Sequence, residues 1–245
     1  MKRFLVALQF LTILPVRIRS EITPEDLGGS LRYFPLVGLL LGLALAGTAL
    51  LLGYLPHPVV AVLVLILSLA LTGGIHLDGF ADTCDGFGGL RPKEKVLEIM
   101  RDSRVGVMGV TGVFCLLALK GVLVASVAPD ILWRLLILMT VFSRWSQVLV
   151  CCTSSYARAE GKAKHFVEYA GPKDLLAASI FASVAILFLA RWRTLLVLFL
   201  SLLVLLLFLM YVKRRIGGVT GDIIGAASEI TEVGILLFGL IYLDS

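Results

Sequence analysis

The chain has 245 residues, of which 59% are hydrophobic and only 16% are charged, and its formal net charge is +5. A soluble domain carries about 25% charged residues, so this composition excludes an ordinary water-soluble domain and indicates a bilayer protein. The positive charge does not indicate a nucleic-acid partner, because membrane proteins collect Lys and Arg in their cytoplasmic loops and the sequence has no aromatic-basic strand pattern.

The chain begins with a short apolar stretch between basic residues. The first residues, MKRFLVALQFLTILPVRIR, imitate a signal peptide, but they lack a small-x-small cleavage site, and Pro15 and Arg17 follow the apolar stretch at once. The stretch is also shorter than the roughly 20 residues that a spanning helix needs. We therefore predict an interfacial helix that is retained in the mature protein.

Longer apolar segments follow, most of them close to the length of a transmembrane helix, roughly 20 residues. They cover residues 34–55, 58–77, 105–128, 131–152, 175–190, 194–212 and 223–243. The predicted fold class is therefore an all-α, polytopic integral membrane bundle, with about seven transmembrane helices plus the N-terminal interfacial helix. No segment has the composition of a soluble second domain, so we expect a single transmembrane catalytic domain over residues 1–245.

Basic residues are concentrated on one side of this topology. Seventeen of the 22 Lys and Arg residues fall in the N-terminal segment and in the loops 78–104, 153–174 and 213–215, whereas only Arg191 and Arg193 fall on the opposite side. The positive-inside rule then places the N-terminus and every longer polar loop in the cytoplasm, and the C-terminus outside. Because a channel or transporter needs polar lining through the whole bilayer, this one-sided distribution favours an enzyme that works at the cytoplasmic boundary.

The segment TGGIHLDGFADTCDGFGGL (72–90) places three aspartates directly after an apolar run. The spacing of Asp78, Asp82 and Asp85 puts them at about 0°, 40° and −20° around a helix axis, which is one narrow stripe. Three carboxylates on one stripe repel each other in a low dielectric, so we expect a cation among them. Hard oxygen ligands suit Mg²⁺. The alternative is a solvated helix end.

The segment EIMRDSRVG (98–106) supplies cations. We predict that Arg101 and Arg104 share a helix face, where two guanidiniums beside a carboxylate cluster would hold a phosphate against a metal. Asp102 either joins the metal ligands or orients the arginines. The alternative is local pairing of Glu98 with Arg101.

The segment GGVTGDIIGAASEITEV (217–233) places Asp222 at the mouth of the last span, with Glu229 and Glu232 two to three turns further along it. An ionisable residue inside a span is costly and is a functional hypothesis by default. The alternative is a glutamate that is merely bonded to a neighbouring helix. The available partners are Arg144, Gln147 and Lys120, although Lys120 could instead snorkel outward.

The sequence contains no GxxxxGK[ST], GxSxG or HExxH motif. This disfavours a P-loop nucleotide hydrolase, a serine hydrolase of the α/β-hydrolase type and a zinc protease. Aspartates for a divalent metal with arginines nearby remain, and phosphoryl transfer needs that combination.

Five stretches in this order, FLTILPVR, RYFPLVGLLLG, TGGIHLDGFADTCDGFGG, EIMRDSRVGVMGV and GGVTGDIIGAASEITE, resemble the cobalamin synthase family over almost the whole chain. Its members are adenosylcobinamide-GDP ribazoletransferases. The resemblance implies a Mg²⁺-dependent enzyme of the bacterial cytoplasmic membrane. This enzyme joins α-ribazole, or its 5′-phosphate, to adenosylcobinamide-GDP and releases GMP, with the active site facing the cytoplasm.

This resemblance and the residue pattern together give a set of candidate residues. The candidate metal ligands are Asp78, Asp82, Asp85 and Asp222, and the candidate catalytic residues are Asp82, Arg101, Asp102, Arg104 and Glu229. The two arginines would hold the diphosphate, and Asp102 or Glu229 would accept the proton of the attacking hydroxyl.

Two other functions stay open. One is a CDP-alcohol phosphotransferase of lipid synthesis, although Asp82 stands where its D-G-x-x-A-R signature has Arg. The other is a metal-ion transporter that uses the same carboxylates.

The oligomeric state is also open, because glycine-rich spans such as 38–53 can pack helices within one chain or between the chains of a homo-oligomer.

Overall fold

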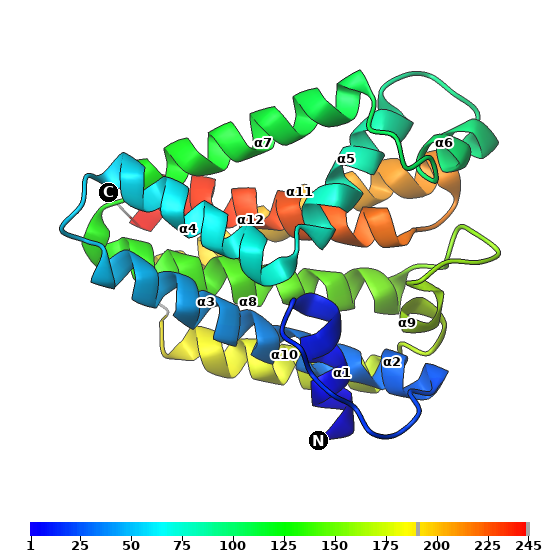
Figure 1. Ribbon diagram of the computed structural model, residues 1–245, viewed down its shortest axis with the longest axis horizontal. Helices are drawn as coiled ribbons and strands as arrows, with labels where there is room; N and C mark the ends of the chain where they lie inside the picture. The colour runs from blue at the N-terminus through cyan, green and yellow to red at the C-terminus, as the bar shows by residue number, and fades with distance from the viewer. Residues whose placement is uncertain (190–191, 244–245) are drawn as a thin grey trace.

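The computed structural model describes residues 1–189 and 192–243 and confirms an all-helical chain. Figure 1 shows long helices packed in one bundle, with shorter helices gathered toward one end. Arg191 lies outside the described residues. In chain order the helices are α1 (Lys2–Leu11), α2 (Pro24–Ser30), the 3-10 helix η1 (Leu31–Tyr33), α3 (Phe34–Leu51), α4 (His57–Thr72), α5 (Ile75–Phe87), α6 (Lys93–Ile99), α7 (Val107–Ser126), α8 (Pro129–Thr153), α9 (Lys164–Glu168), α10 (Pro172–Leu187), α11 (Trp192–Ile216) and α12 (Gly221–Leu243).

Five helical segments are long and apolar enough to cross a bilayer: Pro24–Leu51, which ends with α3, and the helices α7, α8, α11 and α12. A sixth crossing is counted only if α4 and α5 form one broken span. The helix α10 has 16 residues, a length of about 24 Å, which is short of the hydrocarbon core of about 30 Å. Within the described ranges, the predicted number of seven spans is therefore not confirmed, although each apolar segment does form a helix.

The N-terminal segment forms the short helix α1, as predicted, and its side chains Val6, Ala7 and Leu11 are buried against the bundle. The helix has 10 residues, which is half of the roughly 20 that a span requires. It therefore packs on the bundle without crossing a membrane.

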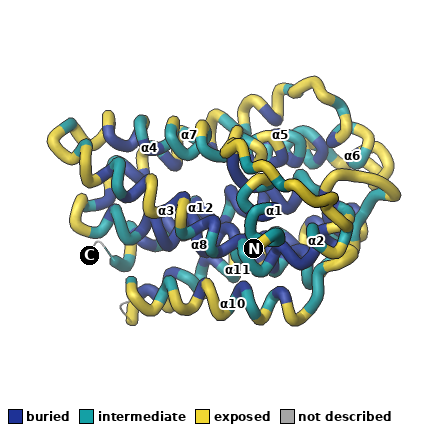
Figure 2. The backbone as a smooth tube through the Cα atoms, turned by 60° about the horizontal axis from the view of Figure 1, so that its bottom comes forward, coloured by how far each residue is buried: buried dark blue, intermediate teal, exposed yellow. Residues whose placement is uncertain are grey.

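The helix α8 is central, and most of its residues are buried (Figure 2). It packs closely on α3 because two glycines of α3 have no side chain there. A Cβ at Gly38 would lie 2.5 Å from the Thr140 carbonyl oxygen, and a Cβ at Gly42 would lie 2.7 Å from Ile137 Cα. Small residues permit such close contact between helices in lipid, so these two glycines of the 38–53 segment serve packing within one chain.

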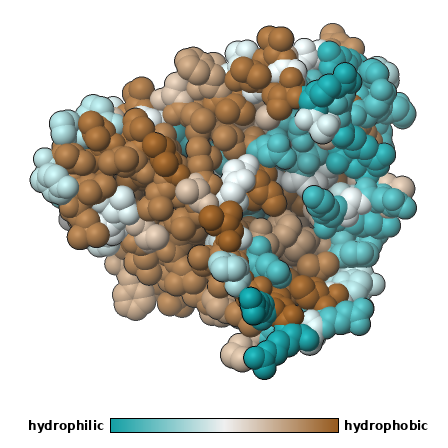
Figure 3. Space-filling model, in the orientation of Figure 1, coloured by the Kyte–Doolittle hydropathy of each residue, from teal (hydrophilic) through white to brown (hydrophobic). Residues whose placement is uncertain are grey.

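Polar residues gather at one end of the molecule. In Figure 3 the hydrophilic surface lies mainly over the end that carries α5, α6 and α9, while most of the remaining visible face is hydrophobic. The C-terminus lies at the opposite end (Figure 1). The one-sided distribution of polar groups that the sequence predicts is therefore present in the fold.

A sharp bend between α4 and α5 brings the aspartate motif to this polar end. Gly73 and Gly74 adopt φ values of +63° and +69°, a left-handed conformation that glycine adopts without steric cost. The two helix axes differ by 93°, so α5 does not continue in the direction of α4. The predicted span 58–77 is wrong at its end, because the helix stops at Thr72.

Candidate active site

The helix α5 carries the three aspartates on one continuous helix, as predicted, and it lies against the start of α12. Glycines on both helices allow the approach: a Cβ at Gly79 would lie 2.9 Å from Asp222 Cα, and a Cβ at Gly225 would lie 3.6 Å from Gly79 Cα. This packing brings Asp222 close enough to influence the ionisation of Asp82, as its neighbour Asp78 also does. Asp85 also influences Asp82, so all four predicted metal ligands lie in one neighbourhood.

The loop that follows α8 adds a cation to this group. The Ala157 N–H donates to the Val219 carbonyl oxygen at 2.8 Å, and the Val219 N–H donates to the Ser155 carbonyl oxygen at 2.9 Å. These two bonds fix Arg158 beside α12, where its Nη2 lies 2.9 Å from Asp222 Oδ2. The Arg158 side chain is only 9% exposed, so this ion pair is shielded from water.

Negative charge exceeds positive charge in this group. Asp82 lies on α5, outside the five long apolar segments, and partial burial raises the pKa of its carboxyl to about 7, with Asp222 and Asp78 shifting it in the same direction. Arg158 lowers this pKa but does not offset the other contributions. A partly buried carboxyl group that holds a proton near neutral pH, with other carboxylates nearby, marks a place where a bound cation would be stabilised.

The carboxylate of Asp85 is bonded to the start of α7. Its Oδ2 accepts a hydrogen bond from the Gly106 N–H at 2.6 Å, and its Oδ1 accepts one from the Gly109 N–H at 2.8 Å. These N–H groups belong to the first turn of α7, where no intrahelical acceptor is available, and a negative charge is favourable at that helix end. Asp85 therefore caps α7, a role that its position on the α5 stripe did not indicate.

The two arginines of the segment RDSR (101–104) lie in different surroundings. The predicted helix face shared by Arg101 and Arg104 is wrong, because α6 ends at Ile99. Arg104 is exposed and pairs with Asp102 at 2.7 Å, and its hydrogen bonds lower the pKa of the Asp102 carboxyl to about 2. Arg101 instead lines a groove beside α6 together with Arg158, the arginine that pairs with Asp222.

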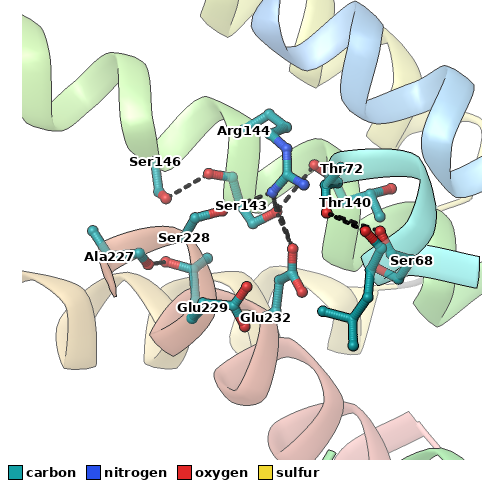
Figure 4. Close-up of polar contacts among 12 residues, drawn as sticks. Ser68, Thr72, Thr140, Ser143, Arg144, Ser146, Ala227, Ser228, Glu229 and Glu232 are labelled. Atoms are coloured by element: carbon teal, nitrogen blue, oxygen red, sulfur yellow. Dashed lines mark hydrogen bonds and ion pairs between the residues drawn. The ribbon is translucent and has the colours of Figure 1, made fainter. Parts of the chain in front are cut away.

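The glutamates of α12 form a separate buried charge cluster, deeper in the bundle. The Lys120 Nζ donates to Glu229 Oε2 at 2.5 Å and to Glu232 Oε2 at 2.6 Å. Figure 4 shows Arg144 reaching from α8 to α12, where its Nη1 donates to Glu232 Oε1 at 3.0 Å and to Ser228 Oγ at 2.7 Å. Two cations thus neutralise two anions, which confirms Lys120 and Arg144 as partners of the glutamates. Lys120 is buried and does not snorkel outward.

A cavity of about 310 Å³ adjoins the aspartate group. Asp78, Asp222 and Arg158 line it, together with apolar residues such as Leu31, Phe34 and Phe166. Glu229 does not line this cavity; it lines a separate space of about 10 Å³ with Lys120. The structure therefore does not bring Glu229 together with the predicted metal ligands.

The described part of the chain contains no group of three His, Cys, Asp or Glu side chains close enough together to hold a metal ion. The donor chemistry of the site still fits Mg²⁺, because the available ligands are hard carboxylate oxygens with unbalanced negative charge. Mg²⁺ typically keeps several waters and takes only one or two protein carboxylates together with substrate phosphates. One or two of Asp78, Asp82 and Asp222 can provide such carboxylates.

Comparison with known proteins identifies the relatives of this chain. Residues 3–240 match the family model for cobalamin-5-phosphate synthase. The chain belongs to the cobalamin-5-phosphate synthase family. An adenosylcobinamide-GDP ribazoletransferase of Clostridium acetobutylicum is 39% identical over 96% of this chain and 94% of its own length. Another from Geotalea daltonii is 38% identical over 95% and 94%, and one from a Roseiflexus species is 39% identical over 93% and 85%. No solved structure matches the chain.

Sequence reasoning did not assign several residues that lie at this candidate site. Arg158 and Tyr156 belong to the segment YARAEGKAKHF, whose YAR resembles the family but for which no role was predicted from the sequence. Gln147 was interpreted as a partner of the glutamates, but it lines the 310 Å³ cavity. A polar residue in a predicted span was the available signal for Gln147.

Proposed function

We propose that this member of the cobalamin-5-phosphate synthase family is an adenosylcobinamide-GDP ribazoletransferase. The reaction joins α-ribazole or its 5′-phosphate to adenosylcobinamide-GDP and releases GMP, which assembles the nucleotide loop of cobalamin. The family match over residues 3–240, with relatives of that name at 38% and 39% identity, carries the proposal. The carboxylates and arginines at the polar end support it, because phosphoryl transfer needs metal and cations around the reacting phosphate.

We propose that Asp78, Asp82 and Asp222 hold Mg²⁺. The ion would neutralise oxygens of the substrate diphosphate and so stabilise the departing GMP. Asp85 is left out of this set because both of its oxygens already accept hydrogen bonds from α7.

Arg101 and Arg158 are proposed to hold the diphosphate, since they line one groove and Arg158 also pairs with Asp222. Arg104 is 88% exposed and paired with Asp102, so it would reach the substrate only after that pair opens. We assign proton transfer to neither Asp102 nor Glu229. The pKa of Asp102 is about 2, which makes it a weak base, and Glu229 is bound to Lys120.

We propose that the enzyme spans the bacterial cytoplasmic membrane several times, with the site facing the cytoplasm. The support is the concentration of basic residues in the loops at the polar end. A metal-ion transporter is less well supported, because Lys120 neutralises Glu229 and the space beside them, about 10 Å³, is about one water in size. A CDP-alcohol phosphotransferase would form lipid from CDP-diacylglycerol and an alcohol, which a direct assay would show.

The test is GMP release from adenosylcobinamide-GDP by membranes that contain the protein, with and without α-ribazole and Mg²⁺. Wild-type protein is expected to need both and to form a cobalamin product. The Asp82→Asn variant is expected to lose at least about 100-fold in turnover, whereas Asp130→Asn, an exposed change at the start of α8, is expected to retain it. GMP release that is independent of α-ribazole would indicate a hydrolase instead.

A further inference from the structure

The 310 Å³ cavity that Asp78 and Asp222 line is also lined by apolar and aromatic side chains. We propose that this cavity is the binding site of the acceptor nucleoside, with its flat base between phenylalanine rings and its ribose directed at the aspartate end. The inference rests on the proposed function, because it assigns one of the two substrates of that reaction to a particular place.

Three phenylalanines from different helices form the apolar wall. Phe10 of α1, Phe34 of α3 and Phe166 of α9 all line the cavity. The ring centroids of Phe10 and Phe166 lie 4.4 Å apart, and those of Phe34 and Phe166 lie 5.9 Å apart. Such rings offer faces and edges for a flat aromatic ligand, and contacts of this kind tolerate different bases because every base has a π-face.

Two buried polar side chains in the cavity wall have unused hydrogen-bonding atoms. Gln147 is 1% exposed, and its Oε1 has no hydrogen-bond partner within the described residues. The Nε of Arg158 is buried and lacks a partner in the same way, although its Nη2 is paired with Asp222. Buried polar atoms are nearly always hydrogen-bonded in native proteins, so these two atoms indicate a ligand with hydroxyl groups, which can both donate to an oxygen and accept from an N–H.

Tyr156 adds a third polar group to the wall. Burial raises the pKa of its phenol, so the hydroxyl stays protonated and can donate to a ligand oxygen. A ribose with several hydroxyl groups matches this set, whereas a lipid tail would leave every one of these groups without a partner.

The size of the cavity distinguishes between the two substrates. A volume of about 310 Å³ lies at the lower end of the roughly 300–1,000 Å³ of small-molecule sites. It can enclose a nucleoside, but a corrinoid joined to GDP is several times larger and must lie outside, at the open polar end. With the nucleoside inside, its ribose would meet the diphosphate beside Arg158, which lines both this cavity and the groove that carries Arg101.

Equilibrium dialysis of α-ribazole against the full-length protein in lipid nanodiscs, without the second substrate, tests this assignment. Phe166→Leu keeps an apolar side chain but removes the ring, and Gln147→Leu removes an amide whose oxygen has no partner. Each is expected to weaken α-ribazole binding about tenfold. Phe114→Leu, a control on α7 that is 71% exposed, is expected to change it by less than about twofold. Binding of adenosylcobinamide-GDP is expected to stay unchanged in all three variants.

The inference is overturned if folded cavity variants bind α-ribazole as tightly as wild type does, or if they weaken the binding of adenosylcobinamide-GDP instead. Gln147→Leu is expected to fold because it removes a buried unpaired polar atom, and it therefore keeps the test valid if Phe166→Leu does not fold. The cavity assignment and the proposed function can be refuted independently of each other. Product formation by wild type, with unchanged KM for α-ribazole in the variants, would refute the cavity assignment alone. α-Ribazole binding that the variants weaken, without any GMP release by wild type, would refute the transferase alone.

Discussion

Replacing Lys120 by Met would leave a buried glutamate without a partner. Lys120 Nζ lies 2.5 Å from Glu229 and 2.6 Å from Glu232, and all three side chains are at most 8% exposed. Glu232 would keep Arg144 at 3.0 Å, so the uncompensated charge would be that of Glu229. Removing one partner of a buried ion pair costs about 3–5 kcal/mol. At about 2–4 °C per kcal/mol for a chain of this length, Tm is expected to fall by about 6–20 °C.

Thermal unfolding in detergent, followed by tryptophan fluorescence, measures this effect. The double variant Lys120→Met/Glu229→Gln restores charge balance and is expected to recover more than half of the lost Tm. Lys95→Met removes a lysine that is 52% exposed and is expected to change stability by less than about 0.5 kcal/mol. The reasoning is refuted if Lys120→Met has the same Tm as the Lys95→Met control, or if the double variant has a lower Tm than Lys120→Met.

Three further predictions concern the aspartate group. Asp85→Ala removes the cap of α7 and should lower the free energy of unfolding by about 1–2 kcal/mol; an increased Mg²⁺ requirement for GMP release would show instead that Asp85 is a metal ligand. Because the pKa of Asp82 is about 7 and Mg²⁺ binds the deprotonated carboxylate, the Mg²⁺ concentration for half-maximal turnover should rise about tenfold per pH unit below that pKa. A constant requirement through this range would contradict that reasoning. Gly79→Ala would place a Cβ 2.9 Å from Asp222 Cα and should reduce turnover more than about tenfold. Gly47→Ala, whose Cβ would have no other atom within 4 Å, should retain wild-type turnover. Equal turnover of the two variants would mean that the close packing of α5 on α12 is dispensable.

Much of the fold could be predicted because bilayer helices must satisfy their backbone internally and expose apolar side chains. Every apolar segment became a helix, and the one-sided polar end followed from the positions of Lys and Arg. The pairing of Lys120 and Arg144 with the α12 glutamates was predictable for a similar reason, since a charge inside a bundle requires a partner. The predicted span ran past the bend after Thr72 because apolar residues continue to Ile75 and Leu77.

The candidate site was only partly predictable, because helical spacing gives the face of a side chain but not what packs against that face. Asp85 shares the stripe of Asp82, yet it caps α7. Arg104 shares a motif with Arg101, yet it pairs with Asp102 in a turn. Arg158 reaches Asp222 through backbone pairing between two distant loops, and periodicity carries no signal for such a contact. Whether Mg²⁺ occupies the aspartate group stays a prediction.

The buried charge cluster also has a consequence for the site at the polar end. Asp222 and Glu229 are seven residues apart on α12, so they lie on nearly the same face, separated by about 10 Å along the axis. Lys120 from α7 holds Glu229, and we expect this contact to help fix the rotation of α12 and with it the direction of Asp222. Lys120 is therefore predicted to be a positioning residue. A Lys120→Met protein that is assayed below its Tm is expected to need more Mg²⁺ for turnover, although Lys120 lines the small inner space and not the 310 Å³ cavity. An unchanged Mg²⁺ requirement would show that the cluster and the site are independent.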